Sequence, residues 1–153
     1  RFGLSEQVFG YFFGAGALAV MVGSFVCTRL QKHISPENLV QYGFAGMLVG
    51  SILMFSRWIP GPWGLAIPMW VVGFFFGMGR PPSNNMILEQ VDRYVGAASS
   101  FMAFLFFMVG AFAMWFISLE WDDPVRVIGA LGIFATGTIL MLSIIFLKRI
   151  ARP

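Results

Sequence analysis

Apolar residues occur in five long runs along this chain, separated by short polar segments. The runs cover 8–27, 39–56, 63–79, 97–119 and 127–147. Every Asp, Glu, Lys and Arg lies outside them. At about 1.5 Å of rise per residue, helices of this size match the roughly 30 Å hydrocarbon core of a bilayer. Because the runs show no period-2 alternation, they predict helices and not barrel strands.

The predicted membrane spans extend slightly beyond the runs, to about 8–28, 38–57, 63–90, 96–119 and 125–148. We therefore expect an all-α fold, a polytopic transmembrane helix bundle with five spans, in one domain over 1–153. Charged residues make up 11% of the chain, against about 25% in ordinary soluble domains. A soluble fold is therefore not expected. Because the chain begins with Arg1 and has an odd number of spans, we expect a fragment of a longer protein.

The basic residues predict which way the helices run. If the turn at 28–38 is cytoplasmic, alternation places the 80–96 segment and the C-terminus on the same side. The basic residues inside are then Arg29, Lys32, Arg80, Arg93, Lys148, Arg149 and Arg152. Those outside are Arg1, Arg57 and Arg126. This excess follows the positive-inside rule and predicts an N-terminus outside and a C-terminus inside.

Few residues suit catalysis or metal binding. Cys27 is the only cysteine and His33 the only histidine, and the chain has no HExxH or GxSxG motif. No acidic residue lies inside any of the five runs, so none is available there as a base. We therefore expect no enzyme, no cofactor and no metal site. The scattered basic residues form no stripe of the kind that binds nucleic acid.

Small residues recur on single helix faces. Gly10 and Gly14 share a face of the first predicted helix, and Gly73 and Gly77 share a face of the third. Such faces allow two helices to approach closely, so we predict that these glycines are helix-packing positions. The alternative is that they form a cavity wall.

The segment 73–96, GFFFGMGRPPSNNMILEQVDRYVG, carries most of the candidate chemistry. In one interpretation the third helix stops near Gly79. Arg80 is then an anchor that extends to the membrane interface, and the residues after it form a solvated loop.

In the other interpretation, the helix continues through Pro81 and Pro82 to about Gln90. The residues on one face are then Gly73, Gly77, Arg80 and Asn84. Arg80 would lie within the membrane, where an unpaired charge costs at least about 2.5 to 3.5 kcal/mol, so it requires a polar cavity or an acidic partner. The two prolines would bend the helix, as occurs along transport pathways.

Charged residues follow this segment. Glu89 and Arg93 have the four-residue spacing that favours an ion pair on a helix, and Asp92 lies between them. We predict a gating charge network at the cytoplasmic end, formed by Glu89, Asp92 and Arg93. The alternative is a solvated helix end.

Several stretches resemble one protein family. The opening FGLSEQVFGYFFGAGALAVMVGSFVCTRL and the turn RLQKHISPENLVQYG resemble the C-terminal half of major facilitator superfamily transporters. GMGRPPSNNMILEQVDRYVGAASSF is similar to a stretch of bacterial drug:proton antiporters of the bicyclomycin and chloramphenicol resistance type, where GxxxP precedes small residues. Here Gly77 and Pro81 supply the GxxxP element.

The resemblance implies the last five helices of a twelve-helix fold in the bacterial inner membrane. It also implies a substrate and coupling pathway bordered by Arg80, Pro81, Ser83 and Asn84. The expected function is part of a proton-coupled exporter of small apolar or cationic solutes that works by alternating access. The expected partners are the lipid bilayer, a missing N-terminal transporter half, a small-molecule substrate and the proton. The alternative is a small non-catalytic membrane subunit or assembly factor.

Overall fold

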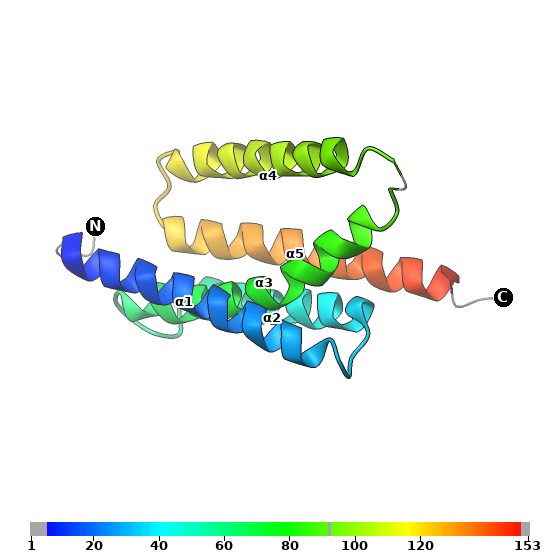
Figure 1. Cartoon of the computed structure of the whole chain (residues 1–153). Helices are drawn as coiled ribbons and strands as arrows, with labels where there is room; N and C mark the ends of the chain where they lie inside the picture. The colour runs from blue at the N-terminus through cyan, green and yellow to red at the C-terminus, as the bar shows by residue number, and fades with distance from the viewer. Residues whose placement is uncertain (1–5, 92, 151–153) are drawn as a thin grey trace.

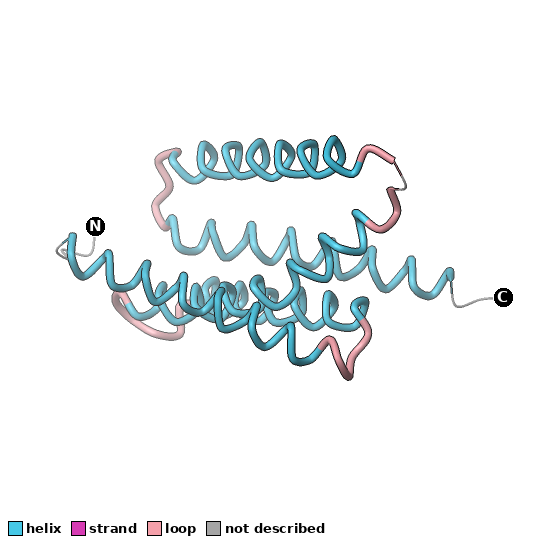
Figure 2. The backbone as a smooth tube through the Cα atoms, in the orientation of Figure 1, coloured by secondary structure: helices cyan, strands magenta, loops and turns pink. Residues whose placement is uncertain are grey.

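Residues 6–91 and 93–150 are described by a computed structural model, and these ranges contain five α-helices and no strand (Figure 1, Figure 2). The helices are α1 (Glu6–Leu30), α2 (Pro36–Ser56), α3 (Trp63–Leu88), α4 (Val95–Ser118) and α5 (Pro124–Ile150). Each helix end lies within two residues of the range expected from the apolar runs. The prediction of an all-helical membrane bundle is confirmed.

Four of these helices, α1, α2, α4 and α5, are long and apolar enough to cross a membrane. The helix α3 is as long as the others but is not among these four; Pro68, Pro81 and Pro82 lie inside it together with Arg80 and two asparagines. Its place as a fifth span stays a prediction.

The helix α3 is packed between α1 and α2, and α2 also packs along α5. Small residues allow these contacts. A side chain at Gly23 of α1 would overlap the carbonyl of Phe74, and Gly43 of α2 lies against the backbone of Gly79. The small buried core, Cys27, Leu39 and Met78, lies at the same junction. Close backbone contact through small residues is the usual way in which membrane helices associate.

The predicted packing glycines fall into two groups. Gly73 and Gly77 lie at the contact with α1, where a side chain at Gly77 would overlap the backbone of Val20. A Cβ atom at Gly10 or Gly14 would meet no atom of the described chain within 4 Å. No described helix packs against these two glycines, so the structure does not support the packing prediction for them. The face of α1 that contacts α3 carries Gly16 and Gly23 instead.

The helix α3 continues through Pro81 and Pro82, as in the second of the two interpretations. Proline has no N–H, so Pro81 leaves the carbonyl of Gly77, four residues earlier, without its helical partner. The hydroxyl of Ser24 in α1 donates a hydrogen bond to this carbonyl, at 3.0 Å. The last turns of α3 then rise toward α4 (Figure 1), and prolines are a common cause of such bends.

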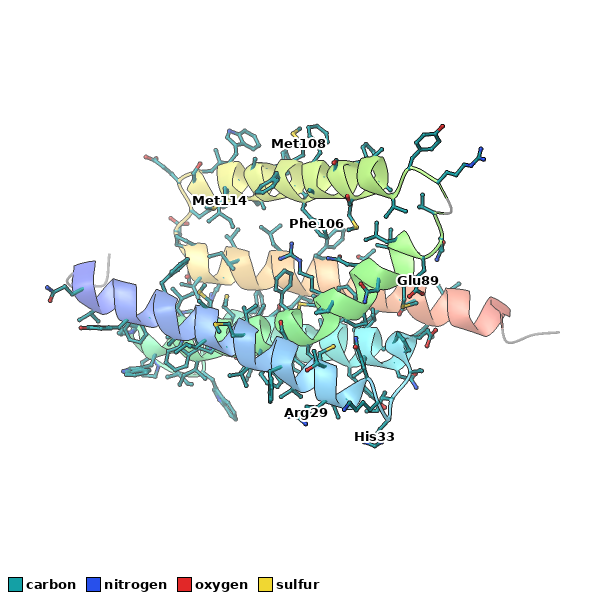
Figure 3. All side chains as sticks on the ribbon, viewed as in Figure 1. Arg29, His33, Glu89, Phe106, Met108 and Met114 are labelled. Carbon is teal, nitrogen blue, oxygen red and sulfur yellow. The ribbon has the colours of Figure 1, made fainter. Side chains whose placement is uncertain are left out.

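The helix α4 stands apart from the rest of the bundle (Figure 1). It has no buried residue and makes few contacts with α3 or α5. Its side chains are apolar on every side: Phe106 points toward α3 and α5, and Met108 lies on the opposite face, yet 48% and 55% of these residues are exposed (Figure 3). A helix that is apolar along nearly all of its length, apart from serines near its two ends, is suited to lipid or to a further helix, and not to water.

Candidate functional site

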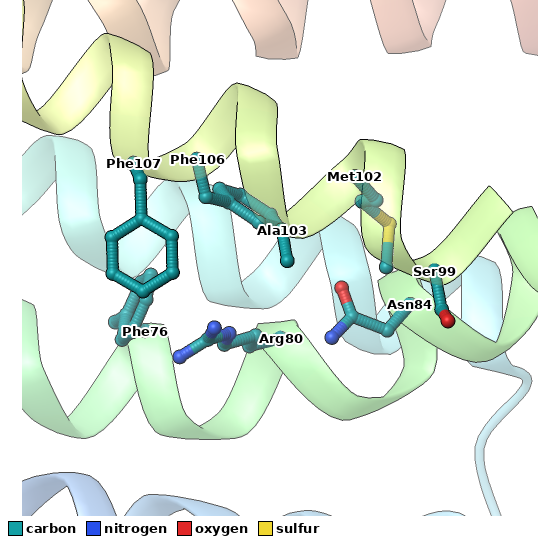
Figure 4. A pocket seen from close by; sticks show the side chains of 8 residues that line it. All are labelled: Phe76, Arg80, Asn84, Ser99, Met102, Ala103, Phe106 and Phe107. Atoms are coloured by element: carbon teal, nitrogen blue, oxygen red, sulfur yellow. The ribbon is translucent and has the colours of Figure 1, made fainter. Parts of the chain in front are cut away.

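A cavity of about 380 Å³ lies between the proline-containing half of α3 and the first half of α4 (Figure 4). Its lining from α3 is Phe76, Arg80 and Asn84, spaced one helical turn apart. Its lining from α4 is Ser99, Met102, Ala103, Phe106 and Phe107. The cavity is thus mostly apolar, with one charged residue, one amide and one hydroxyl.

Arg80 lies between two aromatic rings. Its guanidinium carbon is 5.3 Å from the ring centroid of Phe76 and 5.4 Å from that of Phe106. Both distances are typical of cation–π contacts. Phe76 is one turn closer to the start of α3, so the guanidinium is directed toward the middle of the helix and away from its nearer end (Figure 4). An anchor that extends to the membrane interface has the opposite direction.

The hydrogen-bonding groups around Arg80 are largely unused. Arg80 makes no ion pair, and the amide of Asn84 makes no hydrogen bond, within the part of the chain that is described. The hydroxyl of Ser99 donates to the carbonyl of Gly96 at 2.9 Å. The donors of Arg80 and Asn84 are therefore available to a further group.

The other predicted pathway residues lie elsewhere on α3. Pro81 and Ser83 are half-buried and do not line the cavity. Pro82, which the sequence analysis did not place in the pathway, is among the most completely buried residues. Gly73 and Gly77 face α1 and not the cavity. The four residues that were predicted to share one face of α3 therefore separate into two groups: the glycines pack against α1, and Arg80 and Asn84 line the cavity.

The predicted charge network is not formed among the described residues. Because α3 ends at Leu88 and α4 begins at Val95, Glu89 and Arg93 lie in the connecting segment, and their four-residue spacing is not a helical one. Both side chains are exposed, and no ion pair joins them. Asp92 lies outside the described residues. The gating role of the three residues stays a prediction.

An ion pair that the sequence analysis missed joins two turns. Arg57, just after α2, contacts the carboxylate of Asp123 at 2.6 Å, and Arg126 approaches the same carboxylate at 3.5 Å. The hydrogen bond from Arg57 is the main cause that lowers the pKa of Asp123 below its ordinary value. Both turns were predicted to lie on the outer side of the membrane. That common location was the one feature of the sequence that could have suggested an ion pair between them.

A second cavity, of about 280 Å³, lies between the first turns of α1 and α3. Its lining is Val8, Tyr11, Phe12, Ala15, Trp63 and Trp70. The indole N–H of Trp70 donates to the carbonyl of Phe12 at 3.2 Å, and the ring of Trp63 meets that of Phe12 edge to face. These contacts give the cavity an aromatic wall. Within the described residues, no group of three His, Cys, Asp or Glu is placed to hold a metal ion.

Comparison with known proteins gives two bacterial relatives. The chain is 27% identical over 112 residues to an uncharacterised MFS-type transporter, YdgK, of Bacillus subtilis. It is 29% identical over 115 residues to a bicyclomycin resistance protein homolog of Haemophilus influenzae. Each match covers 72% of this chain and 28% of the relative.

The chain thus spans well under half of the length of these relatives. No protein-family model matches it, and no solved structure matches it. The apolar helices and the two bacterial relatives identify a multi-pass membrane protein, and its location fits a bacterial inner membrane. The predicted resemblance to transporters of the major facilitator superfamily is confirmed.

Proposed function

We propose that this chain is the C-terminal part of a transporter and forms one wall of its solute pathway. The single observation that carries the proposal is Arg80, which is held within α3 between two phenylalanine rings, beside a cavity and without an ion pair among the described residues. A charge at membrane depth is costly, and such residues usually line a substrate pathway or face a partner charge.

The transport mechanism that suits this wall is proton-coupled export by alternating access, with a missing N-terminal half as the opposite wall. The resistance protein homolog of Haemophilus influenzae supports export. The mostly apolar lining of the cavity supports small apolar solutes. The bare guanidinium of Arg80 disfavours the organic cations that the sequence analysis also considered, since like charges repel in a medium of low dielectric constant. We further propose an N-terminus outside and a C-terminus inside, as the basic residues predict.

The test is Arg80→Ala in the full reading frame that encodes this chain. We expect export to fall to background while the amount of protein in the membrane stays normal. Arg29→Ala is the matched control, because Arg29 also stacks on a phenylalanine four residues earlier, Phe25, at 5.3 Å, but lies in the last turn of α1 and lines neither cavity. Unchanged export in Arg80→Ala would contradict the proposal.

A further inference from the structure

The cavity beside Arg80 has an unbalanced charge. Arg80 is its only charged residue, and no Asp or Glu lines it. The described acidic residues all lie at helix ends or in turns: Glu6, Glu37, Glu89, Glu120, Asp122 and Asp123. The guanidinium therefore faces the cavity without a neutralising group from the described chain.

The guanidinium of Arg80, an exposed residue in the described chain, is contacted by two aromatic rings. The rings of Phe76 and Phe106 approach it to 5.3 and 5.4 Å, which limits the conformations of a side chain that is otherwise flexible. A planar guanidinium held in this way presents parallel N–H donors that match the two oxygens of a carboxylate. Asn84, one turn away, adds an amide that is free to donate a further hydrogen bond.

The remaining walls are suited to an apolar body. Met102, Ala103, Phe106 and Phe107 supply thioether, methyl and ring surface. A volume of about 380 Å³ lies in the usual range for sites that bind small molecules. The cavity thus combines one anion-binding corner with an apolar interior.

We propose that this cavity selects solutes that carry a carboxylate on an apolar, aromatic-sized body, and that Arg80 is the residue that distinguishes them from neutral and cationic analogues. The proposal rests on the proposed function, since it names the solute class of the same site. Arg80 donates two parallel hydrogen bonds to the carboxylate, Asn84 donates a third, and the phenylalanine rings enclose the hydrocarbon part.

The test uses three probes with one apolar body: 4-phenylbutyrate, 4-phenylbutanamide and 4-phenylbutylamine. Their dissociation constants are measured on the purified full-length protein in phosphatidylcholine nanodiscs, which contain no net anionic headgroup that competes for Arg80. We expect 4-phenylbutyrate to bind about tenfold more tightly than the amine, because a charge-assisted hydrogen bond is replaced by repulsion between like charges. The amide should fall between them.

Substitution at Arg80 assigns this preference to the guanidinium. Arg80→Gln should remove the tenfold preference, Arg80→Lys should retain part of it, because it keeps the charge but loses the fork of donors, and Arg29→Gln should leave it unchanged. Equal binding of the three probes, tighter binding of the amine, no binding of any probe, or a preference that survives Arg80→Gln would each overturn the proposal. Equal binding is also the result expected if a carboxylate from another part of the full-length protein already neutralises Arg80.

Separate measurements of probe binding and of solute export distinguish the transporter proposal from the proposed carboxylate preference. A full-length protein that exports solutes but binds the three probes equally would leave the transporter proposal standing and overturn the carboxylate preference. A protein that binds 4-phenylbutyrate through Arg80 but exports nothing would overturn the transporter proposal alone.

Discussion

The two sides of α3 differ in what they contact and in which residues they carry. The side toward α1 and α2 carries Gly73, Gly77 and Gly79, and its backbone touches the backbones of the neighbouring helices. The side toward α4 carries Phe76, Arg80 and Asn84 around a cavity. One helix therefore serves both as the central packing element of the bundle and as the carrier of its candidate site.

This difference shows how a helix interrupted by prolines is kept in place beside an open cavity. The packed side supplies the missing hydrogen bond: the hydroxyl of Ser24 satisfies the carbonyl that Pro81 leaves without a partner. Backbone groups in a membrane must be satisfied within the protein. The hydrogen bond that replaces the one lost at Pro81 thus comes from the side of α3 that packs against α1.

The largest effect is expected at the packed side. Gly77→Val would place a side chain against the backbone of Val20, so α1 and α3 would have to separate. We expect a loss of about 3 kcal/mol of stability, the upper range for an overpacked contact, measured as a lower midpoint of thermal unfolding in detergent. Gly14→Val is the matched control and should change stability by less than about 0.5 kcal/mol, because a Cβ atom at Gly14 would meet no atom of the described residues within 4 Å. Equal destabilisation by the two variants would contradict the distinction between the faces.

A smaller effect is expected at the hydrogen bond behind the prolines. Ser24→Ala should destabilise the protein by about 1 kcal/mol, because the Gly77 carbonyl loses its donor. In the Pro81→Ala background the new backbone N–H reaches the same carbonyl, so Ser24→Ala should then cost almost nothing. The double-mutant cycle should therefore show coupling between Ser24 and Pro81. Additive effects of the two substitutions would disprove this role of the serine.

The sequence predicted the helices better than it predicted their contacts. The apolar runs predicted the ends of α1, α2, α4 and α5 to within three residues, since hydrocarbon thickness and backbone satisfaction determine where a membrane helix can begin and end. For α3 the run ended at Gly79 and two helix ends stayed open, whereas the helix continues to Leu88.

The sequence did not show which glycines pack. Gly14 and Gly77 each follow another glycine by four residues, but their surroundings in the structure differ. The sequence singled out Arg80 as a candidate pathway residue, and that role stays a prediction. The contact of Arg80 with Phe106 depends on where α4 lies, which no local pattern determines.

The smallest effect concerns the exposed ion pair between the turns. The folded-state pKa of Asp123 is lowered, chiefly by Arg57, so the pair stabilises the protein above the ordinary pKa of an aspartate. This contribution is lost as the pH falls through the lowered pKa. Asp123→Asn should therefore weaken the fall in thermal stability on acidification and make little difference at neutral pH, because exposed pairs contribute little. An unchanged acid profile would contradict this role of the pair.

If the Arg80 side of α3 lines a cavity that water and solute enter while its other side is packed, the two sides should differ in their access to a reagent dissolved in water. The most direct measurement is the labelling rate of single cysteines with a membrane-impermeant thiol reagent, in the otherwise cysteine-free full-length protein. Asn84→Cys lies on the cavity side, and Met78→Cys, where the native residue is 5% exposed, lies on the packed side. We predict that the cysteine at position 84 reacts, that the transported solute slows this reaction, and that the cysteine at position 78 stays unreactive. Equal labelling of the two positions, or no labelling at position 84, would contradict the account.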